Sequence, residues 1–105
     1  MSLSRAKEVI TIEAQAVKNL LKHLDDNFLK AIDVISKCRG RVIVSGMGKT
    51  GIIGRKIAST FSSTGTPSLW MHSAEAAHGD LGQVTKNDVV VILSNSGETD
   101  ETKNL

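Results

Sequence analysis

The sequence of 105 residues has little of what several classes of protein require. Its single cysteine, Cys38, excludes an internal disulfide framework and a zinc site built from cysteines. Phe28, Phe61 and Trp70 are its only phenylalanine, tyrosine or tryptophan residues, which argues against the base-stacking platforms that bind RNA or single-stranded DNA. No apolar run approaches the roughly 20 residues of a membrane span, and the amino end lacks the apolar stretch of a secretory signal.

An excess of one charge is also lacking. Thirteen basic residues against 11 acidic ones leave a formal net charge of +2, and the two signs are interspersed. This balance gives no reason to expect nucleic acid or an anionic membrane as a partner. With 40% hydrophobic and 23% charged residues, the composition is that of one small globular domain. The single cysteine and the lack of a secretory signal lead us to expect a protein of the reducing cytoplasm.

Residues 1–40 predict two amphipathic helices. Apolar side chains recur at spacings of three and four between residues 5 and 24, at Ile10, Ala14, Val17, Leu21 and Leu24. Residues 25–27 (Asp-Asp-Asn) offer caps for a second helix, and Gly40 is expected to end it in the left-handed conformation. These helices are expected to pack on the rest of the domain or at a subunit seam.

Residues 41–105 alternate between strand and helix patterns. Apolar, β-branched runs at 41–45 and 88–93 predict buried strands, and 68–71 predicts another between them. An amphipathic pattern over about 50–62 predicts the intervening helix. The alternation favours a flavodoxin-like, doubly wound parallel sheet whose strand order begins 2-1-3. Such sheets normally have more than three strands, so we interpret 41–105 as the first part of a larger domain, truncated after the third strand.

A glycine-rich loop at 46–51 (Gly-Met-Gly-Lys-Thr-Gly) joins the first strand to the next helix. Its backbone N–H groups can approach an anion closely, the helix amino end adds a partial positive charge, and Lys49 adds a full one. It is not a Walker A loop, because Ile43 stands where that motif needs a glycine. It fits G-x-G-x-x-G, but the acidic residue that should hold the ribose is replaced by Met71 and His72. NAD binding and a turn that binds nothing remain alternatives to phosphate binding.

A second loop, residues 94–99 (Ser-Asn-Ser-Gly-Glu-Thr), follows the third strand. Ser94, Ser96 and Thr99 supply hydroxyls beside the unpaired N–H groups of a helix start, a combination that suits a phosphate. The alternative interpretation is a simple helix cap, which serine and asparagine favour without any ligand. Because the first and third strands should be neighbours at the switch point of the sheet, we expect both loops to border one pocket.

Four blocks of the sequence resemble the sugar isomerase (SIS) domain of the arabinose-5-phosphate isomerases. They are Val-Ser-Gly-Met-Gly-Lys-Thr at 44–50, Ser-Thr-Gly-Thr-Pro at 63–67, His-Ser-Ala-Glu-Ala-Ala-His-Gly-Asp-Leu-Gly at 72–82 and Ser-Asn-Ser-Gly-Glu at 94–98. The similarity runs from about residue 9 to 105. It implies conversion of D-arabinose 5-phosphate to D-ribulose 5-phosphate through an enediol, without a cofactor, on the route to the bacterial acid sugar Kdo and lipopolysaccharide. It also implies a homotetramer.

The resemblance assigns roles to individual residues. Lys49 and Glu101 take the catalytic positions of the family. His72 is also a position where a divalent metal can bind in relatives, where metals tend to inhibit. The expected sugar-phosphate contacts are Gly46, Gly48, Thr50, Gly65, Thr66, His72, His78, Ser94, Asn95, Ser96 and Thr99.

Two features of the sequence qualify this resemblance. A further catalytic carboxylate and a catalytic histidine of the family lie beyond residue 105, so the chain alone should bind its ligand weakly and not turn it over. Ile52 stands where many relatives carry a polar residue. A regulatory SIS module that binds a sugar phosphate without catalysis is the alternative. The absence of a basic recognition helix before the first strand disfavours that alternative.

Overall fold

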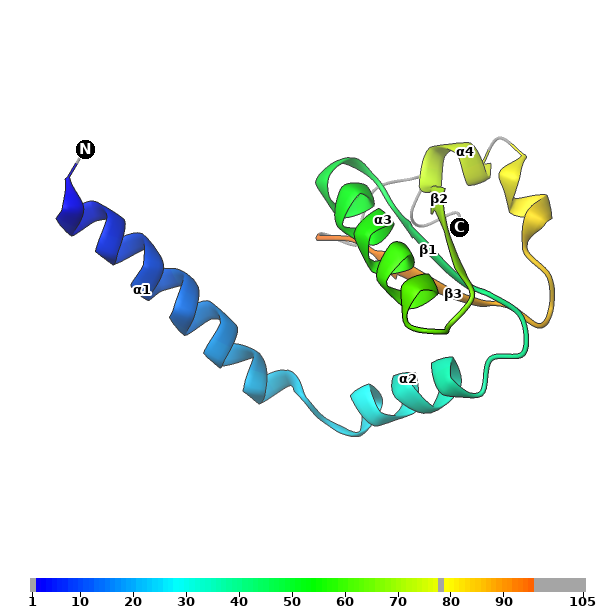
Figure 1. The fold of residues 1–105 in the computed structure, drawn as a ribbon, viewed down its shortest axis with the longest axis horizontal. Helices are drawn as coiled ribbons and strands as arrows, with labels where there is room; N and C mark the ends of the chain where they lie inside the picture. The colour runs from blue at the N-terminus through cyan, green and yellow to red at the C-terminus, as the bar shows by residue number, and fades with distance from the viewer. Residues whose placement is uncertain (1, 78, 96–105) are drawn as a thin grey trace. The chain divides into compact units, whose positions relative to one another are not determined.

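The computed structural model describes residues 2–77 and 79–95. The chain divides into two compact units, Met1–Asp33 and Val34–Leu105 (Figure 1). No helix in the described part of the chain is long and apolar enough to cross a membrane.

The first unit is helical. Helix α1 (Leu3–Asn19) starts at Ser2, whose hydroxyl accepts a hydrogen bond from the Arg5 N–H at 3.2 Å. The single helix expected over 5–24 is wrong in its last turn, because α1 tightens into the 3₁₀ turn η1 (Leu20–His23). Such tightening lets terminal carbonyls find partners three residues away.

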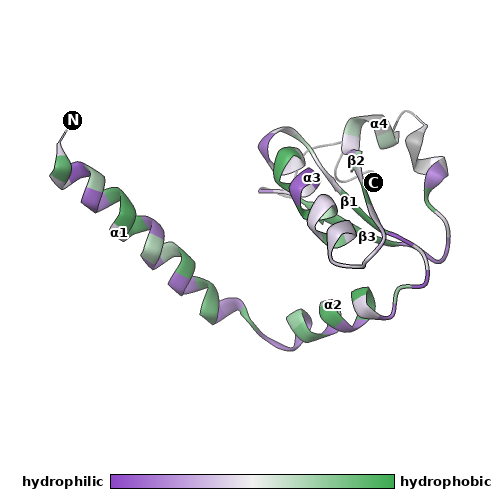
Figure 2. Cartoon of the chain, viewed as in Figure 1, coloured by the Kyte–Doolittle hydropathy of each residue, from purple (hydrophilic) through white to green (hydrophobic). Residues whose placement is uncertain are grey.

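The apolar stripe of the first helix is exposed along α1. None of the residues of α1 is buried, and Ile10 and Val17 are largely exposed. Figure 2 shows the apolar segments alternating with hydrophilic ones along this helix. The expected packing of the stripe, on the domain or at a subunit seam, stays a prediction. Helix α2 (Asp26–Ser36) follows, with the Asp25 carboxylate accepting from the Asn27 N–H at 3.0 Å.

The second unit is built on a parallel sheet. Strands β1 (Val42–Gly46), β2 (Ser68–His72) and β3 (Val89–Leu93) pair in the order β2-β1-β3. Both pairings are parallel, with β1 in the middle. The doubly wound α/β class and the 2-1-3 order expected from the sequence are confirmed.

Helices cover both faces of the central strand. Val42 and Val44, on one face of β1, pack against Ala58 of α3 (Gly48–Ser63). Ile43 points to the other face, where it packs with Met71 of β2 and Ala76 of α4 (Ser73–Ala77). Every residue of β1 is buried, as the apolar run predicted. A 3₁₀ turn, η2 (Asp80–Gln83), leads on toward β3.

The expectation of a fully buried third strand is wrong for the described residues. Val89, Val91 and Leu93 of β3 are half-buried, whereas Val90 is 40% and Ile92 39% exposed. The reason is the position of the strand in the sheet. Val91 and Leu93 share the α3 face with Val44, while α4 covers the opposite face over β1 and β2.

Gly40 ends the segment before β1, but not in the way the sequence suggested. Its φ is not among the positive values, so the expected left-handed helix end is wrong. A Cβ at Gly40 would lie 2.3 Å from Oδ1 of Asp88 and 2.8 Å from the backbone oxygen of Asn87. Glycine is required here by close approach rather than by backbone conformation, and the Gly40 N–H donates to that Asn87 oxygen at 2.9 Å.

Asp88 holds the start of β1 to the start of β3. Its carboxylate accepts hydrogen bonds from the Arg41 N–H at 2.7 Å and from the Thr85 N–H at 2.8 Å, and the Arg41 guanidinium lies 3.8 Å away. The backbone hydrogen bond from Arg41, then that from Thr85, lowers the pKa of Asp88 below its ordinary value. The ionised form is therefore the one that the fold prefers.

Acidification should weaken the fold through Asp88. Because its pKa is lower in the folded than in the unfolded chain, its contribution is complete above the ordinary carboxyl range near 4 and is lost as pH falls below it. We expect Asp88→Asn to lower the urea midpoint at pH 7. The variant should also show a smaller decrease of the urea midpoint between pH 5 and pH 3 than the wild type. The exposed Glu13→Gln is the matched control and should leave the decline unchanged. An equally steep decline in both variants would contradict the role of Asp88.

Candidate functional site

The three strands end together at the carboxyl edge of the sheet. Gly46, the last residue of β1, is in register with His72 of β2 and with Leu93 of β3. The segments that follow each strand therefore start side by side. In open parallel sheets this edge, at the point where the strand order reverses, is where ligands bind.

The turn from β1 into α3 depends on two glycines. Gly48 has a φ of 57°, a left-handed conformation that side chains rarely adopt. A Cβ at Gly46 would lie 3.1 Å from the Gly51 nitrogen and from Oγ1 of Thr50, so the strand end approaches the first turn of the helix closely. The first backbone hydrogen bond of α3 runs from the Gly51 N–H to the Met47 oxygen at 3.2 Å. The N–H groups of Gly48 and Lys49, in the first turn of α3, have no carbonyl partner within the helix and can meet an anion.

The hydroxyl of Thr50 forms two hydrogen bonds within this turn. Its hydroxyl donates to the Met47 oxygen at 2.7 Å and accepts from the Met47 N–H at 3.2 Å. A hydroxyl has one proton, so Thr50 can offer a ligand only its remaining lone pair unless it gives up the Met47 oxygen. As arranged, it shapes the loop rather than donating to a phosphate.

Lys49 is exposed at the start of α3. Of the salt bridges between described residues, none involves Lys49. Its ammonium therefore remains able to meet an anion at the helix amino end, where the partial positive charge of the helix acts in the same direction.

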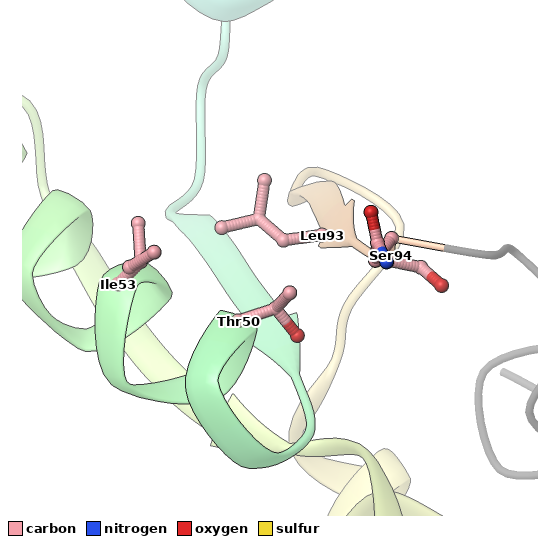
Figure 3. A pocket seen from close by; sticks show the side chains of 5 residues that line it. Thr50, Ile53, Leu93 and Ser94 are labelled. Atoms are coloured by element: carbon pink, nitrogen blue, oxygen red, sulfur yellow. The ribbon is translucent and has the colours of Figure 1, made fainter. Parts of the chain in front are cut away.

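The two loops meet at one hollow of about 260 Å³ (Figure 3). Its lining consists of Thr50, Ile53, Leu93, Ser94 and Asn95. The figure shows Thr50 and Ile53 on the first turns of α3, with Leu93 and Ser94 across from them at the end of β3. Thr50 of the glycine-rich loop and Ser94 and Asn95 of the serine-rich loop thus line one hollow, as expected, whereas Gly46, Gly48 and Lys49 are not among its lining residues. Ile53 was not among the expected site residues.

His72 ends β2 at the same edge. Its Nδ1 accepts a hydrogen bond from the Ala74 N–H at 3.2 Å, and its ring meets that of Trp70 edge-on at 5.7 Å between centroids. Among the described residues, no group of three or more His, Cys, Asp or Glu side chains could hold a metal ion. The metal expected at His72 stays a prediction.

Gly65 and Thr66 lie elsewhere. They form the turn between α3 and β2, where the Thr66 N–H donates to the Phe61 oxygen at 2.9 Å. Ser68, just after them, is in register with Val42 at the amino edge of the sheet. Strands of five residues place the two edges about 13 Å apart. Within one chain the structure does not bring Gly65 and Thr66 to the hollow.

Several expected site residues lie outside the described residues: His78, Ser96, Thr99 and Glu101. Sequence reasoning in turn missed a buried pair, in which the hydroxyls of Ser45 and Ser73 lie 3.0 Å apart and both residues are 0% exposed. A serine within an otherwise apolar buried strand was the available signal, since a buried hydroxyl needs a partner.

Comparison with known proteins places these features in context. Arabinose 5-phosphate isomerase KdsD of Escherichia coli K12 is 54% identical over 95 residues, which are 90% of this chain and 29% of that protein. The structure of an Escherichia coli CFT073 protein in complex with arabinose 5-phosphate is 44% identical, with a TM-score of 0.87, over 99% of this chain and 57% of that one. A structure from Bacteroides fragilis NCTC 9343 is 42% identical, with a TM-score of 0.90, over 97% and 54%.

The match to KdsD thus covers 90% of this chain but only 29% of the length of KdsD. The model of the SIS domain matches residues 34–105, more than half of the chain. That segment contains the sheet, α3 and both loops at its carboxyl edge. The chain belongs to the SIS domain family.

Proposed function

We propose that this chain supplies the sugar-phosphate-binding part of an aldose–ketose isomerase that converts D-arabinose 5-phosphate to D-ribulose 5-phosphate. The observation that carries the proposal is the meeting of the two loops at one hollow, next to the exposed Lys49 at the amino end of α3. The KdsD relative and the solved neighbour in complex with arabinose 5-phosphate support the substrate. The place of the reaction on the route to Kdo is part of the same proposal.

The phosphate is assigned to the loops on physical grounds. A phosphate needs many hydrogen-bond donors, and the amino end of α3 offers backbone N–H groups with a favourable dipole. Gly46 and Gly48 allow a ligand to approach that backbone, and Ser94 and Asn95 stand on the other side of the hollow. Thr50 contributes by holding the loop through Met47 rather than by donating. The expected contacts of Ser96 and Thr99 extend this set.

The chemistry moves one proton between neighbouring carbons and one between their oxygens. A carboxylate removes the proton from C2 of the aldose while O1 gains a proton, which gives the enediol; the carboxylate then returns its proton to C1 while O2 loses its proton and becomes the carbonyl oxygen of the ketose. We assign Glu101 to the carboxylate by the family motif. Lys49 is assigned to the oxygen on which negative charge develops, where a positioned cation lowers the barrier. With the remaining family groups beyond residue 105, the chain alone is proposed to bind weakly and not to turn over.

The position of Gly65 and Thr66 is relevant to the oligomeric state. They lie at the amino edge of the sheet, about 13 Å from the hollow along the strands. A sugar contact from Gly65 and Thr66 would therefore come from a second copy of the chain. This agrees with the proposed homo-oligomer, a tetramer in the resembled family. We also propose that residues 1–40 pack on the domain or at a subunit seam, and that the protein is cytoplasmic.

A chimera tests the proposal. The chain would replace the matching segment of the Escherichia coli KdsD protein, to which it is 54% identical over 95 residues. We expect the chimera to interconvert arabinose 5-phosphate and ribulose 5-phosphate, measured by ketose formation, and the isolated chain to show binding without turnover.

Binding to the isolated chain can be followed through Trp70, its only tryptophan. Arabinose 5-phosphate should change the Trp70 emission, whereas NAD should not. A folded chimera without activity, together with tight sugar-phosphate binding by the chain, would favour the regulatory module. A response to NAD alone would overturn the sugar-phosphate assignment.

A further inference from the structure

The neighbours of His72 determine which nitrogen of its ring carries the proton. The N–H of Ala74 donates to Nδ1 of His72 at 3.2 Å. A nitrogen that accepts a hydrogen bond must carry a lone pair, so in the neutral ring the proton lies on Nε2. The usual partner of Nδ1 in proteins is an acceptor, such as a carbonyl or carboxylate, which selects the opposite tautomer.

We propose that His72 is a fixed hydrogen-bond donor, held as the Nε2–H tautomer, and that Ser45, Ser73 and Trp70 are positioning residues for it. The role of the donor rests on the proposed function, since the group it meets is a sugar oxygen at the carboxyl edge. The tautomer itself rests on the geometry alone.

The buried serine pair fixes the backbone that donates to the ring. Ser73 stands between His72 and Ala74, and its hydroxyl lies 3.0 Å from that of Ser45 on the central strand. Both serines are 0% exposed, so neither hydroxyl can replace its partner with water. An unpaired buried hydroxyl is costly, and the pair therefore ties the start of α4 to β1. This places the Ala74 N–H against the ring.

The side chain of Trp70 restricts the plane of the His72 ring. The two rings meet at 5.7 Å and 73°, an edge-on geometry that aromatic pairs prefer. Trp70 is itself confined, because Arg55 of α3 stacks over it at 5.5 Å and a Cβ on Gly51 or Gly54 would lie only 3.6 Å from it. The ring of His72 thus has a packed neighbour on one side and a backbone donor at Nδ1.

This arrangement separates two uses of His72. A sugar hydroxyl or carbonyl oxygen can accept from Nε2–H without any change in the ring. A divalent cation at Nε2 needs the lone pair there, so the proton must move to Nδ1 and the bond from Ala74 must break. The structure therefore favours the sugar contact expected of His72 over the metal.

Nitrogen NMR of the histidine rings tests the tautomer. With ¹⁵N-labelled histidine at pH 8.5, well above the ordinary histidine pKa of about 6.5, long-range N–H correlations report which ring nitrogen is protonated. We expect only Nε2–H for His72, while the exposed His23 serves as the reference in the same spectrum. A dominant Nδ1–H form at His72 would overturn the proposal.

Variants of Ala74 and Ser73 test whether these residues set the tautomer of His72 or only support the fold. Ala74→Pro removes the donor and should shift His72 toward a mixture of tautomers, whereas Ala74→Ser keeps the N–H and should not. Ser73→Ala should shift the ratio in the same direction as Ala74→Pro, and it covers the case in which proline prevents folding. A tautomer ratio that stays unchanged in folded Ala74→Pro and Ser73→Ala variants would exclude the positioning role.

Ligand binding tests the donor. His72→Gln keeps an N–H donor and should retain the Kd for arabinose 5-phosphate, while His72→Leu removes it and should weaken binding about fivefold. Equal weakening by glutamine and leucine would contradict a donor role. If wild-type His72 is Nε2–H but no sugar phosphate binds, the proposed function fails and the tautomer assignment stands.

Discussion

Replacing Lys49 by alanine in the chimera should lower kcat/KM for arabinose 5-phosphate by about 10² to 10³, the usual effect of removing a group that stabilises developing negative charge. Lys49 is exposed and forms no ion pair with any described residue, so its replacement should break no ion pair within that part of the fold. Its charge stands at the positive end of the α3 dipole, where a cation is unfavourable. The free energy of unfolding should therefore stay unchanged or rise slightly while activity falls.

Lys56→Ala is the matched control for this experiment. Lys56 is also an exposed lysine of α3, two turns further along the helix. Both variants change the net charge equally, so a general weakening of anion attraction would affect them alike. Activity close to wild type for Lys49→Ala, or an equal loss in both variants, would mean that Lys49 has no role at the reacting atoms.

Gly40→Ala should give the largest loss of stability, about 3 kcal/mol. The added Cβ would lie 2.3 Å from Oδ1 of Asp88 and 2.8 Å from the oxygen of Asn87. Because the second contact is with backbone, rotation of a side chain cannot relieve it. The displaced Asp88 would also loosen the hydrogen bond from the Arg41 N–H that precedes β1. Urea unfolding of the purified chain measures the change.

Gly82→Ala is the control for the glycine effect. No atom of a described residue lies within 4 Å of a Cβ at Gly82, and its φ is not positive. Alanine there should be neutral or stabilise slightly, because it reduces the freedom of the unfolded chain. If both alanine variants lost stability equally, close packing around Gly40 would not be the cause.

The sheet could be read from the sequence because local patterns and topology rules agree. β-branched runs such as Val42–Val44, separated by an amphipathic helix, leave few alternatives to a parallel sheet with right-handed crossovers. The strand order then follows, and with it the meeting of the two loops. The glycine pattern at 46–51 also located the turn correctly, since Gly48 has the positive φ that such a turn requires.

Other features could not be predicted, because they depend on contacts between distant residues. The role of Gly40 follows from its approach to Asp88 and Asn87, residues far along the chain. The exposure of Val90 and Ile92 depends on which helix covers which part of the sheet, and an apolar run alone does not show this. The donation from Ala74 to His72 requires the start of α4 to be placed, and no spacing rule specifies it.

One measurement tests most directly whether both loops hold the same anion. In a ¹H–¹⁵N NMR titration of the chain with arabinose 5-phosphate, we expect saturable shifts of the amides at 47–51 and 94–99 with a single Kd. Inorganic phosphate should move the same amides in the same direction. Shifts confined to one loop, or separate dissociation constants for the two, would contradict a shared site.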